Sequence, residues 1–251
     1  MQTRPSFINE IDFKLLKEKF PDEKKFKKVI HKIENDYPVQ YAIGDVEFFD
    51  TKILVNRHVL IPRFETELLV SKLIDYIKKY DLIRSRILDV CTGSGCIAIS
   101  LKKSLIHSKV HGLDKSTPAL RTAKKNARLN GVDVSFKRCD VLKKIKIDEK
   151  FSILVSNPPY VKLDEYTSPN TKYEPSIALF PGEDDIIFYK KILEFAATCM
   201  YPKNIIAFEI GSTQAERICA YAKKIFKDAK IVVEKDYAGF ERFIFIFNNC
   251  E

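Results

Sequence analysis

The chain has 251 residues, of which 45% are hydrophobic and 31% are charged, and its formal net charge is +9. That length supports one full core with a small extension. The composition excludes a membrane-spanning protein, because no apolar run approaches the ~20 residues of a transmembrane helix. The first residues also lack the apolar core of a signal peptide, so we expect a cytoplasmic protein.

The basic surplus and the cysteines narrow the choice of partners. An excess of lysine and arginine suits a polyanionic neighbour such as RNA or DNA. Lysines that are spread along a chain, as they are here, are equally compatible with a surface that has no binding role. The six cysteines have no CxxC spacing and no histidine at a ligand offset. The sequence therefore predicts neither a metal site nor a disulfide framework.

Three units are expected along the chain. Residues 1–36 are predicted to form a short helical unit, in which Pro21 ends one helix and Asp22 caps the next. Residues 37–62 are rich in β-branched and aromatic residues, which predicts a linking β-hairpin. Residues 63–251 form the third and largest unit.

From residue 86 onward, strands and helices alternate. The predicted strands are 86–90, 109–114, 134–140, 151–157, 204–211, 230–237 and 242–247. Such alternation predicts an α/β sheet whose parallel central strands are buried on both faces. Only AGFE separates the last two strands, which is too short for a parallel crossover, so they must be antiparallel. This Rossmann-like, mostly parallel seven-stranded sheet with an antiparallel C-terminal hairpin resembles the class I S-adenosylmethionine-dependent methyltransferase fold.

A glycine-containing turn, DVCTGSGC, follows the first strand of this sheet. Gly93 and Gly95 permit a tight turn where α/β sheets bind ligands. A similar turn also serves NAD, but a dinucleotide loop has three spaced glycines around a pyrophosphate, and the third position here is Ala98. Asp89 would repel a pyrophosphate, whereas it suits the ammonium and sulfonium of S-adenosylmethionine. We therefore favour S-adenosylmethionine over NAD.

Two more acids end the next strands, Asp114 about 20 residues after the loop and Asp140 after the third strand. Asp114 is placed to accept from ribose hydroxyls, and Asp140 to reach the adenine amino group. Each acid alone could be a helix cap or a surface residue, and Asp140 stands beside Lys137 and Arg138. The predicted cofactor-binding residues are Asp89, Cys91, Thr92, Gly93, Ser94, Gly95, Asp114, Asp140, Val141 and Asn157.

The fourth strand ends in Asn157-Pro158-Pro159-Tyr160. Proline fixes φ and has no backbone N–H, so this loop is stiff and presents acceptors: the Asn157 side-chain oxygen and the Pro158 carbonyl. Together with the flat face of Tyr160, they suit a planar NH2 group. Hydrogen bonds that strengthen as charge develops on nitrogen favour the transition state. Our hypothesis is that no general base is needed, because the methylated nitrogen loses its proton afterwards. The motif alone does not separate an amide from a nucleobase.

The chain also resembles the protein-(glutamine-N5) methyltransferases of peptide chain release factors, the PrmC/HemK family. The motifs that carry the resemblance are PVQYAIG at 38–44, VLIPRFETELLV at 59–70, DVCTGSGCIAIS at 89–100, SNPPYV at 156–161, YEPSIALFPGEDDIIFY at 173–189, EIGSTQ at 209–214 and DYAGFERFI at 236–244. The segments on either side of the Asn-Pro-Pro-Tyr loop are more specific to this family than the loop itself.

The resemblance implies methyl transfer from S-adenosylmethionine, with S-adenosylhomocysteine as product, to the glutamine side chain of the Gly-Gly-Gln tripeptide in release factors. It implies Asn157, Pro158 and Tyr160 as the catalytic residues. The implied substrate-binding residues are Asn157, Pro158, Pro159, Tyr160, Arg63, Glu67 and Glu174. For Arg63 and Glu67, a local ion pair at a helix start is the alternative. We expect a monomer whose partner is a release factor; the basic charge allows direct nucleic-acid contact, which the reaction does not require.

Three departures from the family pattern stand out. Cys91 replaces a usual glycine, Phe64 replaces a usual proline, and only ~36 residues precede residue 37, about half of the usual helical domain. The last departure concerns how the substrate docks and leaves the chemistry unchanged. The alternative functions are an amino-methyltransferase acting on adenine or guanine, a binding protein that has lost the chemistry, and an NAD-dependent oxidoreductase. The first of these is disfavoured because the chain lacks a basic, aromatic-rich tract that could bind a nucleic-acid strand.

Overall fold

The computed structural model describes residues 4–143, 147–162 and 168–250. In chain order its elements are α1 (Glu10–Lys19), α2 (Glu23–Glu34), α3 (Val39–Ile43), β1 (Asp45–Phe48), β2 (Thr51–Leu54), α4 (Phe64–Lys79), β3 (Arg86–Val90), α5 (Cys96–Ser104), β4 (Lys109–Asp114), α6 (Thr117–Leu129), β5 (Ser135–Arg138), β6 (Phe151–Ser156), η1 (Pro169–Tyr173), η2 (Ser176–Ala178), α7 (Ile187–Cys199), β7 (Met200–Glu209), α8 (Ala215–Ile225), β8 (Lys230–Lys235) and β9 (Glu241–Asn248). Within these ranges, none of the helices has the length and apolar character needed to cross a bilayer.

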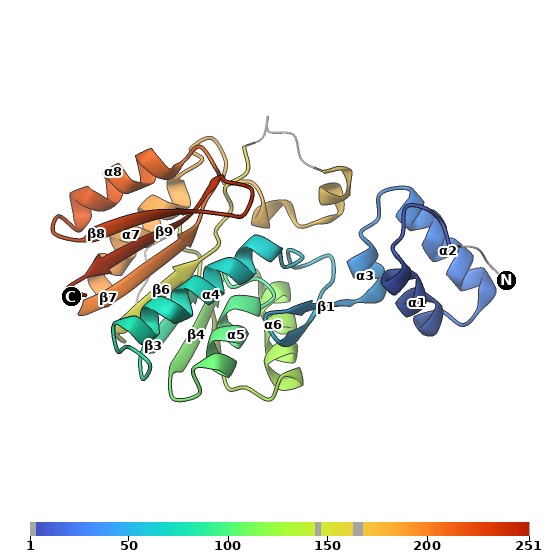
Figure 1. Ribbon diagram of the computed structural model, residues 1–251, viewed down its shortest axis with the longest axis horizontal. Helices are drawn as coiled ribbons and strands as arrows, with labels where there is room; N and C mark the ends of the chain where they lie inside the picture. The colour runs from blue at the N-terminus through green and yellow to red at the C-terminus, as the bar shows by residue number, and fades with distance from the viewer. Residues whose placement is uncertain (1–3, 144–146, 163–167, 251) are drawn as a thin grey trace.

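Among the described residues, seven strands form one sheet in the order β5-β4-β3-β6-β7-β9-β8 (Figure 1). The five from β3 to β7 are parallel to one another, and β9 is antiparallel to both β7 and β8. The predicted fold, with its antiparallel C-terminal hairpin, is confirmed. β3 lies between β4 and β6, so the chain leaves the centre of the sheet in opposite directions. This is the switch point at which open α/β sheets bind ligands.

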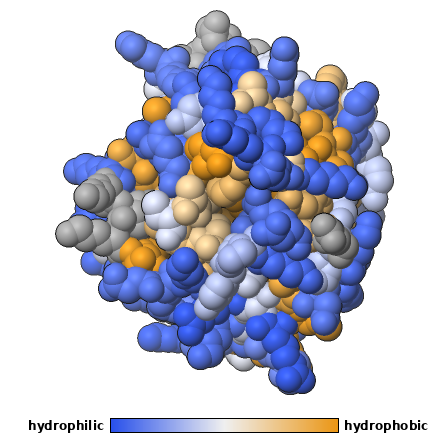
Figure 2. Space-filling view, turned by 90° about the vertical axis from the view of Figure 1, so that its left-hand side faces the viewer, coloured by the Kyte–Doolittle hydropathy of each residue, from blue (hydrophilic) through white to orange (hydrophobic). Residues whose placement is uncertain are grey.

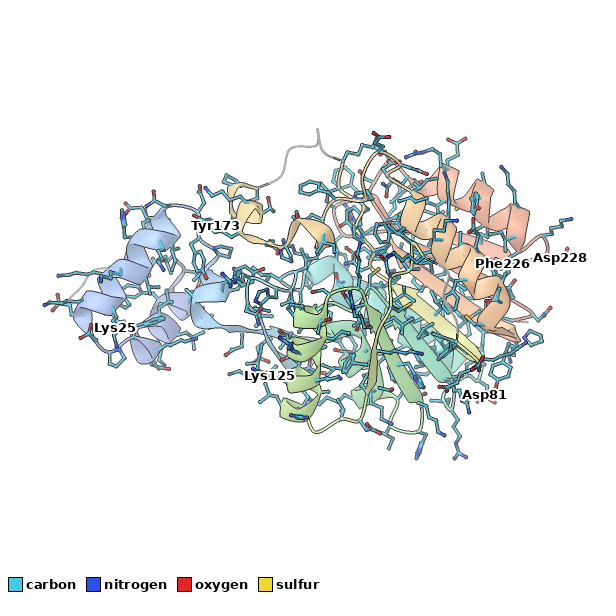
Figure 3. The ribbon with its side chains drawn as sticks, turned by 180° about the vertical axis from the view of Figure 1, so that it is seen from behind. Lys25, Asp81, Lys125, Tyr173, Phe226 and Asp228 are labelled. Atoms are coloured by element: carbon cyan, nitrogen blue, oxygen red, sulfur yellow. The ribbon has the colours of Figure 1, made fainter. Side chains whose placement is uncertain are left out.

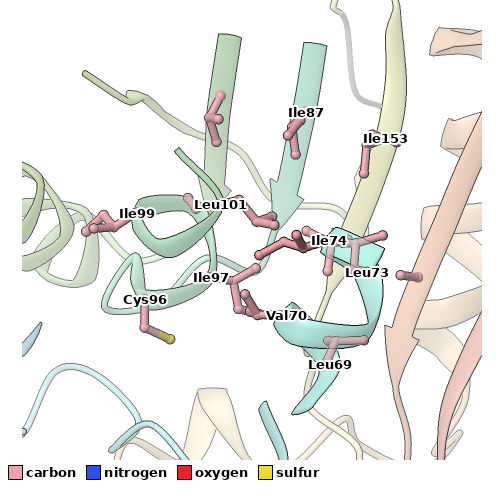
Figure 4. Packing of buried hydrophobic residues seen from close by; sticks show 14 of the residues in the cluster. Leu69, Val70, Leu73, Ile74, Ile87, Cys96, Ile97, Ile99, Leu101 and Ile153 are labelled. Carbon is pink, nitrogen blue, oxygen red and sulfur yellow. The ribbon is translucent and has the colours of Figure 1, made fainter. Parts of the chain in front are cut away.

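The two faces of the sheet bury separate apolar clusters. Phe243, Phe245 and Phe247 of β9 pack in the cluster that contains α4 and α5, and the alternate residues Ile244 and Ile246 pack in the cluster that contains α7 and α8. Figure 4 shows side chains of α4 and α5 meeting those of the central strands. Helices therefore cover both faces, which is why the strands read as continuous apolar runs.

The N-terminal helices stand to one side of the sheet (Figure 1). Both helices of the expected pair are present; Asn9 caps α1, and the side chain of Asp22 caps α2 as predicted. The helices share a small apolar cluster that includes Phe13 and Phe26. The expected link differs in one respect, because Val39–Ile43 is helical and the hairpin begins only after Gly44, whose φ of 92° ends that turn. Burial of this turn against α1 outweighs its β-like composition.

The β1–β2 hairpin is fixed to the sheet domain through side-chain amides of α6. Asn126 accepts from the N–H of Leu54 at 2.8 Å and donates to its carbonyl at 3.1 Å. Asn130 makes the same pair of bonds with Lys52. At the opposite end of the sheet, β8 is an edge strand with exposed lysines at both termini. Figure 2 views this side and shows a mainly hydrophilic surface around small hydrophobic areas, which disfavours edge-to-edge pairing.

Candidate active site

The glycine turn joins β3 to α5 and is tightly wound. Cys91, Gly93 and Gly95 all have positive φ, of 63°, 55° and 83°. A side chain on Gly95 would also lie 3.1 Å from Ala123 of α6 and from Ile99 of α5, so the positive φ and the close packing both favour glycine there. Cys91 holds this conformation without being glycine, at a cost on the order of 1 kcal/mol. This is the physical consequence of its departure from the family pattern.

Asp89 occupies a different place from the expected one. It is fully buried under the turn, where one carboxylate oxygen accepts from Thr92 Oγ1 at 2.5 Å and from the N–H of Ala98 at 3.2 Å. Its other oxygen, Oδ1, is buried and has no hydrogen-bond partner among the described residues. Asp89 does not line the cavity described below. It braces the turn from beneath, and its contact with the cofactor stays a prediction.

Stability should respond to pH through Asp89. Burial raises the pKa of Asp89 to about 7, against hydrogen bonds from Thr92 and Ala98 that lower it. A raised pKa means that the folded state holds the proton more tightly than the unfolded state, so stability is lost as pH rises from about 4 to about 7. Asp89→Asn keeps the bonded oxygen and places NH2 at the unpartnered position. Relative to wild type, its free energy of unfolding should rise by up to about 1.4 kcal/mol per pH unit in that window.

Urea titrations at pH 4.5, 5.5, 6.5 and 7.5 measure this difference. A difference between the two proteins that stays constant across the series would contradict an Asp89 that titrates inside the fold.

A first cavity opens above the turn, at the carboxyl ends of β3, β4 and β6. Of the predicted cofactor residues, those that line it are Cys91, Thr92, Gly93, Ser94, Asp114, Asp140, Val141 and Asn157. Asp114 is fixed in place, because its two oxygens accept from the N–H groups of Gly93 at 2.8 Å and Ser116 at 2.7 Å. The carboxylate of Asp140 lies 3.4 Å from the ammonium of Lys115, so it forms an ion pair while it lines the cavity.

The donor set of this cavity fits S-adenosylmethionine. An anchored carboxylate at Asp114 suits a pair of ribose hydroxyls, and the apolar walls, which include Leu113, Val141 and Phe188, suit an adenine ring. Within the described turn, no run of backbone donors is free for a pyrophosphate, because the N–H of Gly93 is bonded to Asp114 and that of Gly95 to Thr92. The site therefore favours this cofactor over NAD.

A second cavity adjoins the first. It is lined by Asn157 and Tyr160 of the Asn-Pro-Pro-Tyr loop together with residues that include Glu174, Glu209 and Arg242. Asn157 and Arg63 line both cavities, so they lie where the two meet. Pro159 lines the first cavity, and Pro158 lines neither. The side chain of Asn157 is therefore exposed to two neighbouring binding spaces.

Hydrogen bonds connect this loop to three residues that sequence reasoning did not select. The NH2 group of Asn157 donates to Thr66 Oγ1 at 3.1 Å, and Thr66 donates to Glu209 at 2.7 Å. The hydroxyl of Tyr160 donates to the other oxygen of Glu209 at 3.2 Å. Gln214 holds the backbone carbonyl of Tyr160 at 3.2 Å. Thr66, Glu209 and Gln214 all stood inside quoted motifs, but no local signal distinguished them.

Arg63 and Glu174 meet across the entrance. The guanidinium of Arg63 bonds one oxygen of the buried Glu174 carboxylate, and the N–H of Ile61 donates to the other at 3.1 Å. Glu174 is thus attached to the segment before α4, and Arg63 pairs with this distant acid instead of a neighbour at the helix start. Glu67 lies elsewhere, because its carboxylate accepts from the N–H of Phe49 in the hairpin and lines neither cavity.

Breaking this ion pair should destabilise the fold unequally from its two ends. Arg63→Met leaves a buried carboxylate without its cation and should cost about 1–3 kcal/mol, discounted because Arg63 is partly exposed. Glu174→Gln keeps a neutral hydrogen-bonding group and should cost less. The double variant should recover part of the Arg63→Met loss in urea unfolding, whereas strictly additive losses would contradict a coupled pair.

The sequence of the chain is similar to those of known methyltransferases. The chain matches the family model described as methyltransferase small domain over residues 64–171. It is 39% identical over 222 residues to the release factor glutamine methyltransferase of Flavobacterium psychrophilum, covering 86% of this chain and 77% of that protein. The enzyme of the same name from Lactococcus lactis is 38% identical over 235 residues, 92% of this chain and 85% of its own. The chain belongs to the release factor glutamine methyltransferase family.

Solved structures support the fold of this family member. A methyltransferase from Pyrococcus furiosus has a TM-score of 0.58 at 18% identity, covering 79% of this chain and 89% of that one. The Thermus thermophilus 16S rRNA N2 G1207 methyltransferase also has a TM-score of 0.58, at 14% identity, with 82% and 50% covered. The class I methyltransferase fold is confirmed, and so is the family resemblance.

Proposed function

We propose that this protein transfers a methyl group from S-adenosylmethionine to the side-chain amide nitrogen of the glutamine in the Gly-Gly-Gln motif of peptide chain release factors. The observation that carries the proposal is the family membership, with 39% identity to a release factor glutamine methyltransferase over 86% of this chain. The geometry agrees, because two adjoining cavities share Asn157, one suited to the cofactor and one open to an acceptor.

The residues of the second cavity bind and align the acceptor amide. With its NH2 group bonded to Thr66, Asn157 has its oxygen left to accept from the substrate, and no hydrogen bond from the described residues reaches that oxygen. Tyr160 is held by Glu209 and supplies a flat surface. When bound, S-adenosylmethionine supplies an electrophilic methyl group. Alignment of the amide nitrogen toward the first cavity replaces a bimolecular encounter with an oriented one.

Proton removal needs no strong base in this arrangement. An amide nitrogen becomes acidic once it carries a fourth substituent, so its proton can leave to water after the carbon–nitrogen bond has formed. Hydrogen bonds from the substrate NH2 group to its acceptors strengthen as positive charge develops on the nitrogen. They therefore stabilise the transition state more than the bound substrate. Burial raises the pKa of Tyr160 above its usual value, so its phenol stays neutral and contributes its ring.

We further propose that the chain works as three units: residues 1–36 dock the release factor, 37–62 link, and 63–251 catalyse. The support is a set of contacts around Tyr173, whose hydroxyl donates to the carbonyl of Asn35 at 3.1 Å and whose ring meets that of Tyr37. Figure 3 shows Tyr173 beside the N-terminal helices. The segment that contains Tyr173 and the cavity-lining Glu174 thus touches the end of the N-terminal helices. We infer a monomer in the cytoplasm, where release factors act; light scattering of the purified protein tests the oligomeric state.

A labelling experiment tests the function. The protein is incubated with S-adenosylmethionine carrying a labelled methyl group and, separately, with a release factor, the same factor with its Gly-Gly-Gln glutamine replaced by alanine, RNA, and DNA. Label on the intact release factor alone is the expected result. Label on nucleic acid would favour the nucleobase alternative, and absence of label from all four would overturn the proposal.

A further inference from the structure

One buried carboxylate connects both functional side chains of the Asn-Pro-Pro-Tyr loop. Glu209 ends β7, is 1% exposed, and lies beside β6, from which the loop emerges. Its Oε2 accepts a hydrogen bond from the hydroxyl of Thr66 at 2.7 Å, and the Thr66 oxygen in turn accepts one from the NH2 group of Asn157 at 3.1 Å. Its Oε1 accepts a hydrogen bond from the hydroxyl of Tyr160 at 3.2 Å. None of these bonds is made between chain neighbours.

The direction of these bonds follows from what each group can donate. An ionised carboxylate only accepts, so the single proton of Thr66 points to Glu209. Thr66 then has only lone pairs to offer Asn157, which must present its NH2 group. An amide turned the other way would set the Asn157 oxygen against an oxygen with no proton between them. The Asn157 oxygen must therefore face away from Thr66, toward the cavities that Asn157 lines.

We propose that Thr66 and Glu209 are positioning residues that fix the orientation of the Asn157 amide. Its oxygen, and not its NH2 group, then always faces the substrate NH2 group that receives the methyl group. Asparagine amides have two nearly isosteric orientations, and only one of them can accept from an amide nitrogen. The inference rests on the proposed function, because the acceptor must be an NH2 donor for the orientation to matter.

The pKa of Glu209 is raised on balance, and three neighbouring groups oppose that rise and so stabilise the ionised form that this orientation needs. Burial raises the pKa of Glu209, and the negative charge of Glu65 raises it further. Hydrogen bonds from Thr66 and Tyr160 and the positive charge of Arg242 act in the opposite direction. Arg242 is itself held by Asp236 at 3.1 Å and by the carbonyl of Ile210 at 3.0 Å. The groups that face Glu209 thus come from α4, the loop after β6, and β9 together.

Thr66→Val removes the hydroxyl at nearly constant volume and should release the amide. We expect kcat to fall about 10-fold, with KM for the release factor and Kd for the cofactor changing less than about 3-fold. Thr66→Ser keeps the hydroxyl and should restore most of the activity. The chain offers a matched control: Asn56 donates to Thr122 at the same 3.1 Å, outside both cavities. Thr122→Val should leave kcat unchanged.

A measurement without cofactor or acceptor separates this inference from the proposed function. In 15N-labelled protein, the side-chain NH2 signal of Asn157 is assigned by its loss in Asn157→Ala. Its exchange with water should be slow in wild type, Thr66→Ser and Thr122→Val, and faster by at least about 10-fold in Thr66→Val. Unchanged exchange in Thr66→Val, or a Thr66→Ser variant that behaves like valine, overturns the inference. A wild-type protein that fails to label release factors overturns the proposed function instead, and the exchange data still decide the orientation.

Discussion

Asn157→Ala is expected to lower kcat for release factor methylation by about 10²- to 10³-fold while cofactor affinity changes less than about 3-fold. The variant removes the acceptor oxygen at the junction of the two cavities. That oxygen holds the nitrogen most strongly as charge develops on it, so its loss should appear in kcat more than in KM. Single-turnover transfer and calorimetric titration with S-adenosylmethionine measure the two effects separately.

Asn249→Ala is the control for this variant, because Asn249 is exposed in the C-terminal segment and lines neither cavity. It should leave both kcat and cofactor affinity unchanged. A large loss of cofactor affinity in Asn157→Ala would mean that Asn157 serves the first cavity and that its assignment to the acceptor is wrong.

The fold was predictable because its signals are local. The strands at 86–90 and 109–114 have the predicted bounds, since buried parallel strands are short apolar runs bounded by turn residues. Asp114, which ends the second of them, could be placed on the ligand-binding rim by topology alone, whereas Asp89, one residue before the end of the first, lies buried under the turn. The stretch at 39–43 was not predictable in this way, because its composition favours a strand and only packing against α1 makes it helical.

The site was less predictable, because it depends on contacts between distant segments. The ETE triplet at 65–67 lies in the first turn of α4, where successive residues point in different directions, so spacing could not tell which one faces the loop. The structure turns Thr66 to Asn157 and Glu67 to the hairpin. Glu209 was missed for the same reason, since its partner Thr66 lies 143 residues away in the chain.

Two buried acids near the site differ in what they contribute. Asp89 has an unpartnered oxygen among the described residues and Glu209 has both oxygens bonded, although burial raises the pKa of each. A satisfied carboxylate orients its donors, whereas a half-satisfied one is a stability cost. Asp114 is bonded through both oxygens, as Glu209 is, and it also lines the first cavity.

Asp114→Asn is therefore expected to raise Kd for S-adenosylmethionine about 10²-fold. The variant keeps the size of the side chain, but its NH2 group can accept neither from a ribose hydroxyl nor from the N–H of Gly93 or Ser116. Asp133→Asn removes the same charge from an exposed loop and should leave Kd unchanged. A change of less than about 3-fold in Asp114→Asn would contradict the ribose assignment.

The same residue gives the affinity a pH dependence. Burial raises the pKa of Asp114, against backbone hydrogen bonds that lower it. As pH falls toward that raised pKa, protonation removes one acceptor, so Kd of the wild type should rise on the acid side and level off above it. The amide in Asp114→Asn does not titrate, so titrations of this variant with S-adenosylhomocysteine should lose the acid limb. An acid limb of equal size in both proteins would contradict Asp114 as the titrating group.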